Sequence, residues 1–211
     1  MQTDHKDKKT DEYFDRTSVD EIYKHIDELL QQKKTVVVAL EGGSASGKTT
    51  LAKELEQRYD CNVFHMDDFF LRPKQRTKER FKEPGGNVDR ERFWEEVIVP
   101  LSKGEIVEYR RFDCSTFTLQ PPVTIKPKRL TIVEGAYSTH PAFGRYYDFS
   151  VFLDIIPQVQ KERILKRNGP EKMERFLKEW IPMEQKYFEV MDVKKRCDII
   201  IDGDECSKER N

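Results

Sequence analysis

The chain alternates between short runs of apolar, largely β-branched residues and longer stretches with helical spacing. Apolar runs without polar alternation are typical of strands that are buried on both faces. The sequence predicts such strands at residues 35–40, 61–66, 129–135, 148–155 and 197–203. Because helices are expected between them, the pattern predicts an α/β fold in which helices cover both faces of a mainly parallel sheet.

Helical periodicity is clear in several segments. An N-terminal helix is expected over residues 18–33, where Ser18 and Glu21 fit a capping box. Asp89 is the expected N-cap of a further helix, and Pro182 is the expected bend of the last one. The remaining helices are predicted at residues 48–58, 88–104, 157–167 and 169–190.

Three other segments complete the organisation of the chain. Residues 1–17 are polar and are predicted to form a mobile tail, and residues 72–87 are charged and rich in Pro and Gly, which predicts a mobile loop. Residues 104–112 and 121–127 are expected to pair as a β-hairpin. With no internal repeat and no strong linker, residues 18–211 are interpreted as a single domain.

Composition and charge narrow the classes of function. The 38 basic and 39 acidic residues nearly balance, which argues against a nucleic-acid or anionic-membrane partner. No apolar run approaches the roughly 20 residues needed to cross a bilayer, and the N-terminus lacks a signal-peptide core. We therefore expect a cytoplasmic protein, and its oligomeric state, including a homo-oligomer, stays open.

The cysteines give little support for a metal site. They form no C-x-x-C pair, so zinc is not expected. Three of them lie in or beside apolar runs, which predicts buried, reduced thiols and a reducing compartment. The four positions are Cys61, Cys114, Cys197 and Cys206.

The segment "GGSASGKT" fits the phosphate-loop pattern G-x-x-x-x-G-K-[ST] in full. Glycines let the backbone curl so that N–H groups point at phosphate oxygens, and the following helix directs its positive end to the same place. Lys48 is expected to reach the β- and γ-phosphates, and Thr49 to offer its hydroxyl to Mg²⁺. The expected nucleotide-binding residues are Gly42, Gly43, Ser44, Ala45, Ser46, Gly47, Lys48, Thr49 and Thr50.

Carboxylates follow two of the predicted strands. Asp67 comes after the second strand, at the sheet edge where open α/β sheets bind ligands, so it is a candidate base for an acceptor hydroxyl. Asp68 is the competing candidate, and a turn or helix cap is the plain alternative for both. Glu134, after the third strand, is a candidate Mg²⁺ ligand.

Basic and imidazole side chains are the other candidates. Arg163, Lys166 and Arg167 share one face of a predicted helix, which suits a group that neutralises phosphate charge, although a solvated helix face is the usual alternative. His65 is interpreted as a packing residue at a strand end. His25 and His140 are interpreted as surface residues rather than ligands.

Together these residues resemble the uridine kinase and phosphoribulokinase family of P-loop small-molecule kinases. The resemblance runs from Thr35 to Asp202 and rests on "GGSASGKTT", "HMDDFF", "GGNVDRERF", "IVEGAY" and the helix with Arg163 and Arg167. It implies a three-layer αβα fold with a parallel five-stranded sheet, a β-hairpin at the acceptor site and a small helical lid.

The resemblance also implies roles for single residues. Asp67 matches the catalytic carboxylate, which also helps to place Mg²⁺, and Glu134 matches a second magnesium-associated acid. Asp89 matches an Asp that bonds sugar hydroxyls, and Arg163 and Arg167 match lid arginines that act in catalysis with Lys48. The substrate contacts implied are Asp67, Phe70, Asp89, Phe112, Asp113 and Phe117.

Two departures from the family pattern concern the acceptor and the lid. Phe112 and Asp113 fit a Tyr-Asp pair, but Phe117 stands where uridine kinases carry a His that reads the pyrimidine. Asn168, Gly169 and Pro170 follow Arg167, in place of the usual lid sequence. The phosphate-transfer half of the pattern is intact, while the base-reading half is altered.

The sequence therefore predicts a phosphotransferase that uses Mg²⁺ and ATP and acts on a small hydroxylated metabolite, with uridine or cytidine as the first candidate. Phe117 keeps pantothenate, glycerate, nicotinamide riboside and a sugar phosphate as alternatives. A nucleotide-binding regulatory protein without efficient turnover is the second class of function. Asp67, Asp89 and the pair Arg163 and Arg167 together argue against it, because a switch needs no acceptor base.

Overall fold

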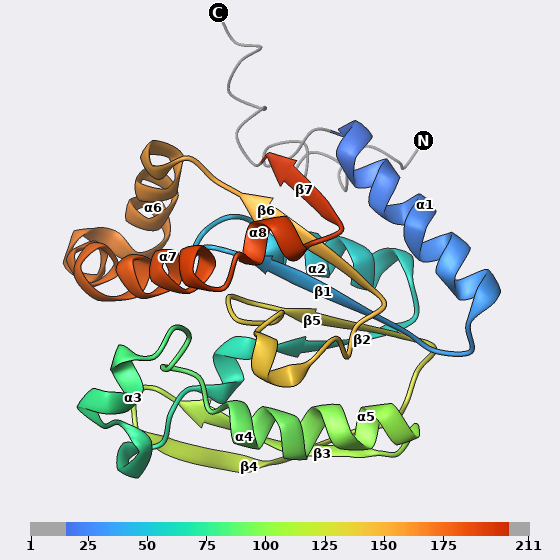
Figure 1. The fold of residues 1–211 in the computed structure, drawn as a ribbon, viewed down its shortest axis with the longest axis horizontal. Helices are drawn as coiled ribbons and strands as arrows, with labels where there is room; N and C mark the ends of the chain where they lie inside the picture. The colour runs from blue at the N-terminus through green and yellow to red at the C-terminus, as the bar shows by residue number, and fades with distance from the viewer. Residues whose placement is uncertain (1–15, 203–211) are drawn as a thin grey trace, which may run out of the picture.

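The computed structural model describes residues 16–202, and its centre is a sheet of five parallel strands in the order β2-β5-β1-β6-β7 (Figure 1). The register places His65 at the end of β2 beside Glu134 at the end of β5. All the predicted core strands are confirmed. They are β1 (Val36–Gly42), β2 (Cys61–His65), β5 (Leu130–Glu134), β6 (Phe149–Asp154) and β7 (Ile199–Asp202).

Helices cover both faces of the sheet, as predicted. Val36, Val38 and Leu40 of β1 pack against α1 and α2 on one face, while Val37 joins the core on the other face with α7 and α8. The alternation follows from the period-two geometry of a strand. The helices named here are α1 (Arg16–Gln32), α2 (Lys48–Arg58), α7 (Ile181–Val190) and α8 (Val193–Arg196). The three-layer α/β architecture is thereby confirmed.

A separate antiparallel hairpin flanks the sheet, as the sequence predicts (Figure 1). It consists of β3 (Val107–Asp113) and β4 (Thr118–Ile125). A continuous helical stretch packs on it: α4 (Arg90–Phe93), the π-helical turn η4 (Trp94–Ile98) and α5 (Val99–Lys103). Asp89 caps this stretch by accepting a hydrogen bond from the Arg92 N–H at 3.2 Å, which confirms the predicted N-cap.

The predicted mobile loop at residues 72–87 is wrong in its secondary structure. It contains the 3₁₀ helix η3 (Pro73–Gln75) and the short helix α3 (Lys78–Lys82). Thr77 caps α3 through the Arg80 N–H. The Arg80 guanidinium then binds both oxygens of Glu91 at 2.9 Å and donates to the carbonyls of residues 86 and 88. Arg80 is one of the charged residues that made the sequence predict an exposed loop, and in the structure its charge is paired with Glu91.

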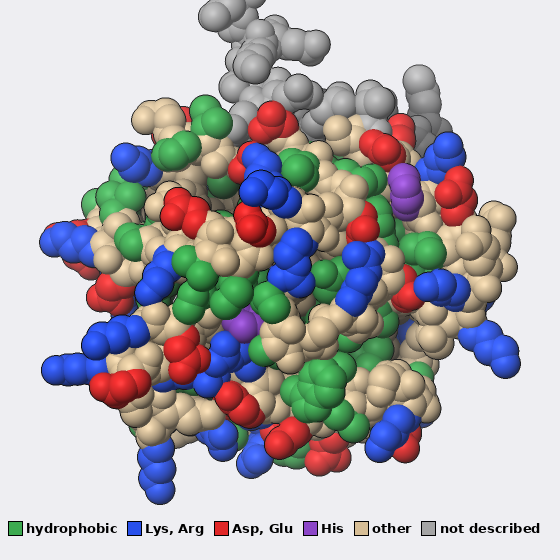
Figure 2. All heavy atoms as spheres, viewed as in Figure 1, with side chains coloured by type: hydrophobic (Ala, Val, Ile, Leu, Met, Phe, Trp, Pro, Cys, Tyr) green, Lys and Arg blue, Asp and Glu red, His purple; other side chains and the backbone are tan. Residues whose placement is uncertain are grey.

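The predicted N-terminal helix is present as α1, but its capping box is wrong. The described part of the helix already begins at Arg16, so Ser18 lies inside it. The predicted tail, residues 1–17, falls mostly outside the described residues. No helix within residues 16–202 has the length and apolar character that a membrane span requires. Figure 2 shows basic and acidic side chains interspersed over the viewed face.

The C-terminal helical region is divided at two points. The first segment is α6 (Pro157–Arg175), interrupted at Gly169, whose φ of +79° and ψ of 170° are not helical. The π-helical turn η6 (Phe176–Trp180) then leads into α7, where Pro182 occupies the second position and needs no intrahelical partner. The predicted break between residues 167 and 169 is confirmed.

The thiols match the prediction only in part. Cys61 is buried and Cys197 is partly buried, but Cys114 is exposed just after β3. Cys114 is therefore not one of the buried thiols, because the hairpin leaves its turn in solvent. Cys206 lies outside the described residues.

Candidate functional site

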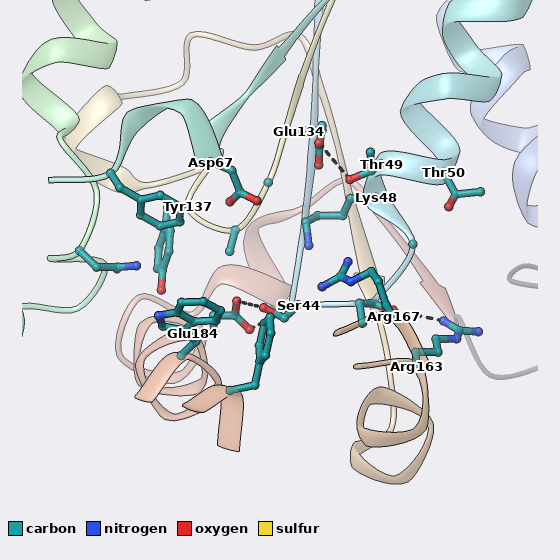
Figure 3. Close-up of a pocket in the computed structure, with 18 of the residues that line it drawn as sticks. Ser44, Lys48, Thr49, Thr50, Asp67, Glu134, Tyr137, Arg163, Arg167 and Glu184 are labelled. Atoms are coloured by element: carbon teal, nitrogen blue, oxygen red, sulfur yellow. Dashed lines mark hydrogen bonds between the residues drawn. The ribbon is translucent and has the colours of Figure 1, made fainter. Parts of the chain in front are cut away.

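A cavity of about 650 Å³ lies at the carboxyl ends of β1, β2 and β5, where parallel sheets bind ligands (Figure 3). The loop after β1, the turn after β2 and the turn after β5 form its floor and one wall. α6, η6, α7 and Asn87, which precedes α4, contribute the rest. In Figure 3, Asp67, Tyr137 and Glu184 lie on one side of the cavity, and Arg163 and Arg167 lie on the other.

The phosphate loop has the geometry that its glycines predict. Gly42 has a φ of +143°, and a side chain there would meet the Leu153 carbonyl at 2.4 Å. Gly47 has a φ of +105° and directly precedes α2. The Lys48 ammonium is buried and donates to the carbonyls of Gly42 and Gly43 at 2.8 and 2.7 Å. The predicted strand–loop–helix unit is thus confirmed.

Glu134 and Thr49 are joined by a hydrogen bond close to Lys48. The Thr49 hydroxyl donates to Glu134 Oε1 at 3.1 Å, and His65 Nδ1 lies 2.6 Å from the same oxygen. Burial raises the pKa of Glu134, but the His65 bond and the Lys48 charge outweigh it and leave this pKa below its ordinary value. The hydrogen bond to Glu134 in turn raises the pKa of His65. His65 is therefore a partner of a site carboxylate, and its predicted role as a packing residue is wrong.

Asp67 and Asp68 lie in the 3₁₀ helix η2 (Met66–Phe69), but they face different surroundings. Asp67 lines the cavity and is open to it, while the protein around the cavity raises the pKa of its carboxyl by desolvation, with the Glu134 charge adding to this effect. Asp68 instead contacts the hairpin, through the Tyr109 hydroxyl at 3.2 Å and Arg111 at 3.4 Å. Of the two candidates, Asp67 faces the cavity.

Arg163, Lys166 and Arg167, the three residues predicted to share a face of this helix, all line the cavity. Arg163 reaches the carbonyl of Ala45 in the phosphate loop at 3.5 Å. The guanidinium carbon of Arg167 lies 6.0 Å from the ring centroid of Phe176. Lys166 lines the cavity beside these two arginines. The helix thus presents cations toward the loop rather than only to solvent.

Glu184 of α7 was missed by the sequence analysis. Its carboxylate accepts the Ser44 N–H at 2.8 Å and the Ser44 hydroxyl at 2.5 Å, and Gln160 of α6 donates to the Ser44 carbonyl at 2.9 Å. A sequence signal did exist, because Glu184 lies between Ile181 and Tyr187 on the buried face of its helix. A carboxylate on an apolar helix face needs a partner.

Two other residues of the acceptor side were also missed. Tyr137 is buried with a φ of +79°. Burial raises the pKa of its hydroxyl well above the ordinary value, and the Asn87 side chain opposes this effect. The Oδ1 atom of Asn87 is buried and has no hydrogen-bond partner within residues 16–202. Both residues line the cavity, together with Phe70 from the predicted substrate set.

The remaining predicted substrate residues do not line this cavity. Asp89 is fully buried and accepts from Arg72 and Gln75 at 3.0 and 2.9 Å. Asp113 accepts from Ser115 in the hairpin turn. Phe117 is 43% exposed, and its ring lies 6.1 Å from that of the buried Phe112 and 5.4 Å from the guanidinium of Arg76. Their role in binding an acceptor stays a prediction.

His140 and His25, both predicted to be surface residues, do not line the cavity and differ in how deeply they are buried. His140 is 2% exposed and stacks on Tyr187 with ring centroids 5.5 Å apart, so its prediction as a surface residue is wrong. Burial lowers the pKa of His140 to about 4. His25 is partly buried and stacks on Phe149.

Comparison with known proteins places the chain. Residues 37–203 match the model of the phosphoribulokinase / uridine kinase family. A uridine kinase of Clostridium perfringens is 25% identical over 186 residues, which cover 80% of this chain and 88% of the relative. The solved structure of a possible uridine kinase from Bacillus stearothermophilus has a TM-score of 0.61 and 24% identity, and covers 85% of this chain and 98% of its own.

A second solved structure, like the first, supports the fold alone. It is a candidate fructose transport system kinase from a Silicibacter species, with a TM-score of 0.65 and 20% identity over 86% of this chain and 98% of its own. The matched span of the family model holds the phosphate loop, Asp67, Glu134 and the basic face of α6, in the order the resemblance requires. The chain belongs to the phosphoribulokinase and uridine kinase family of P-loop kinases.

Proposed function

We propose that the chain transfers the γ-phosphate of ATP, with Mg²⁺, to a hydroxyl group of a small metabolite. The observation that carries the proposal is the placement of Asp67 across one cavity from Lys48 and the α6 arginines (Figure 3). Phosphoryl transfer depends on positioning and on electrostatic stabilisation, and these side chains supply both. A nucleoside is the first candidate acceptor, in line with relatives named uridine kinase.

Different residues of the chain have different roles in the proposed reaction. Asp67 accepts the proton of the attacking hydroxyl, and its raised pKa brings the carboxyl closer to the working pH of a general base. Lys48 and the loop N–H groups hold the phosphates. Arg163 and Arg167 stabilise the negative charge on the transferred group from the opposite wall.

The donor set suits a magnesium ion. The Thr49 hydroxyl and the carboxylates of Asp67 and Glu134 are the hard oxygen ligands that Mg²⁺ prefers. Within residues 16–202, no group of three or more His, Cys, Asp or Glu side chains could hold a metal ion by itself. This suits Mg²⁺, which keeps water and phosphate oxygens among its ligands. When bound, the ion would neutralise charge on the phosphate oxygens.

A coupled ATP-consumption assay against nucleosides and small hydroxylated acids tests the proposal. Asp67→Asn should keep ATP binding within about twofold and lower kcat by roughly 10²–10⁴-fold, because general-base catalysis contributes that much. Normal turnover by this variant would remove Asp67 as the base. If no hydroxylated acceptor stimulates ATP consumption by the unmodified protein, the chain is a nucleotide-binding regulatory protein instead.

A further inference from the structure

Glu184 is a cavity carboxylate that the proposed transfer step does not use. Its side chain is 7% exposed, and its oxygens accept the Ser44 N–H and the Ser44 hydroxyl. A side chain added at Gly43 would lie 3.5 Å from Glu184 Oε2 and 3.1 Å from the Gln160 amide. The carboxylate is therefore fixed against the phosphate loop and cannot swing away from the cavity without breaking these contacts.

Charge is unevenly divided between the two sides of the cavity. Arg163 and Arg167 lie on the α6 side, where phosphates are expected, and Asp67 and Glu184 lie on the other side (Figure 3). Both carboxylates line the cavity, and burial raises the pKa of Glu184 while the Asp67 charge adds to this effect, so the two groups interact. An acceptor whose hydroxyl approaches Asp67 therefore also meets the charge of Glu184. This side of the cavity offers negative charge to whatever molecule enters it.

That side also holds one buried hydrogen-bond acceptor without a partner among the described residues. The buried Oδ1 of Asn87 has no partner within the described residues, and Asn87 lines the cavity beside Tyr137. A buried acceptor without a partner costs free energy that a ligand donor recovers. A molecule with additional hydroxyl or amino groups can supply that donor, whereas a carboxylate or phosphate group cannot.

We infer that Glu184 determines the charge class of the acceptor, which is a neutral or cationic molecule with hydrogen-bond donors besides its reacting hydroxyl. The inference rests on the proposed kinase function and narrows it. Like charges brought together across a binding site are a common means of rejecting the wrong partner. Glycerate, pantothenate and sugar phosphates are thereby disfavoured, while neutral nucleosides and cationic ribosides are retained.

A purely structural role of Glu184 makes a different prediction. If the side chain only fixed the loop through Ser44, its replacement would affect neutral and anionic acceptors equally. Glu184→Gln is the suitable change, because its amide can still bond with both the Ser44 N–H and the Ser44 hydroxyl. Glu189→Gln is the matched control, since Glu189 lies on the same helix and is exposed.

The experiment uses acceptor pairs that differ in one anionic group: uridine and orotidine, pantothenol and pantothenate, glycerol and glycerate. The value of kcat/KM is measured for both members with each variant, at about pH 8, because burial raises the pKa of Glu184 and its carboxylate must be ionised. The unmodified protein should favour the neutral member by at least about tenfold. Glu184→Gln should reduce this preference about fivefold or more, and Glu189→Gln should leave it unchanged.

The outcomes separate the inference from the proposed function. A preference for the anionic members, or equal preferences in the two variants, would overturn the inference while the kinase function stands. If no member is phosphorylated, the kinase proposal fails for these acceptors, and calorimetric binding of the same pairs to the ADP-bound protein decides the charge preference. In that measurement, the inference would be overturned if none of the neutral members bound.

Discussion

Glu41 has the most crowded hydrogen-bond environment of the residues around the phosphate loop. Its side chain is fully buried at the end of β1. Oε1 accepts the N–H groups of Gly42 and Tyr137, both at 3.0 Å, and Oε2 accepts the Thr139 N–H at 3.0 Å and the hydroxyls of Thr139 and Tyr187. One carboxylate thus joins the loop, the turn after β5 and α7.

The Glu41→Gln variant should be less stable than the unmodified protein. An amide has one oxygen, so whichever way it is oriented, at least one buried backbone N–H loses its acceptor. The hydroxyls of Thr139 and Tyr187 can rotate to accept, but the Thr139 N–H cannot. We expect the free energy of unfolding to fall by about 1–3 kcal/mol in urea titrations. The exposed Glu56→Gln variant is the control, and an equal loss there would contradict this account.

At the scale of elements, Gly169 divides α6. Its φ of +79° and ψ of 170° fall in a region that is open essentially only to glycine, and a side chain there would meet nothing within 4 Å. The demand on this position is therefore purely conformational. The chain leaves the first part of α6, with Arg163 and Arg167, and returns through η6 to the wall of the cavity.

The Gly169→Ala variant tests whether this break positions the α6 arginines. The substitution should strain the backbone by about 1–3 kcal/mol. Shifting the arginines should lower kcat by roughly tenfold or more. Gly104→Ala is a matched control, because Gly104 also has a positive φ of 67° and open space around it but lies at the end of α5. Kinetics and unfolding are measured for both variants, and a loss of kcat in Gly104→Ala would argue against an effect specific to α6.

The helices and strands were predictable where the local sequence pattern determines them. Continuous apolar runs identified the buried strands, and the glycines of residues 42–47 fixed the loop. The contacts that complete the site were not predictable, because they depend on register and on distant packing. His65 meets Glu134 only because β2 pairs with β5, and Glu184 meets Ser44 across 140 residues of chain. The same holds for residues 72–87, whose order depends on Arg80 reaching Glu91.

At the scale of the whole molecule, the cavity joins parts of the chain that are far apart in sequence. The phosphate loop, the turns after β2 and β5, and helices α6 and α7 all contribute to its lining. A ligand that contacts several of these parts binds only when they are assembled. Its binding free energy is then added to the stability of the folded chain.

Nucleotide with Mg²⁺ should therefore raise the melting temperature. A free ligand at 100 times its Kd adds about 2.7 kcal/mol, which corresponds to roughly 5–10 °C for a chain of this size. Thermal unfolding with ADP and Mg²⁺ measures the shift, and chelating the metal should reduce it, because the Thr49 and Glu134 oxygens would lose their shared cation.

The Lys48→Met variant serves as the internal control for that shift. It removes the buried ammonium that lies over the loop carbonyls, and with it the cation expected to hold the phosphates. Its own melting temperature without ligand can differ, so only the difference with and without nucleotide is compared. A full shift retained in Lys48→Met would place the nucleotide elsewhere on the molecule. We expect the nucleotide-induced shift in melting temperature to be lost in Lys48→Met but kept in Asp67→Asn. That result would show that Lys48 is needed for nucleotide binding and that Asp67 is needed only for phosphate transfer.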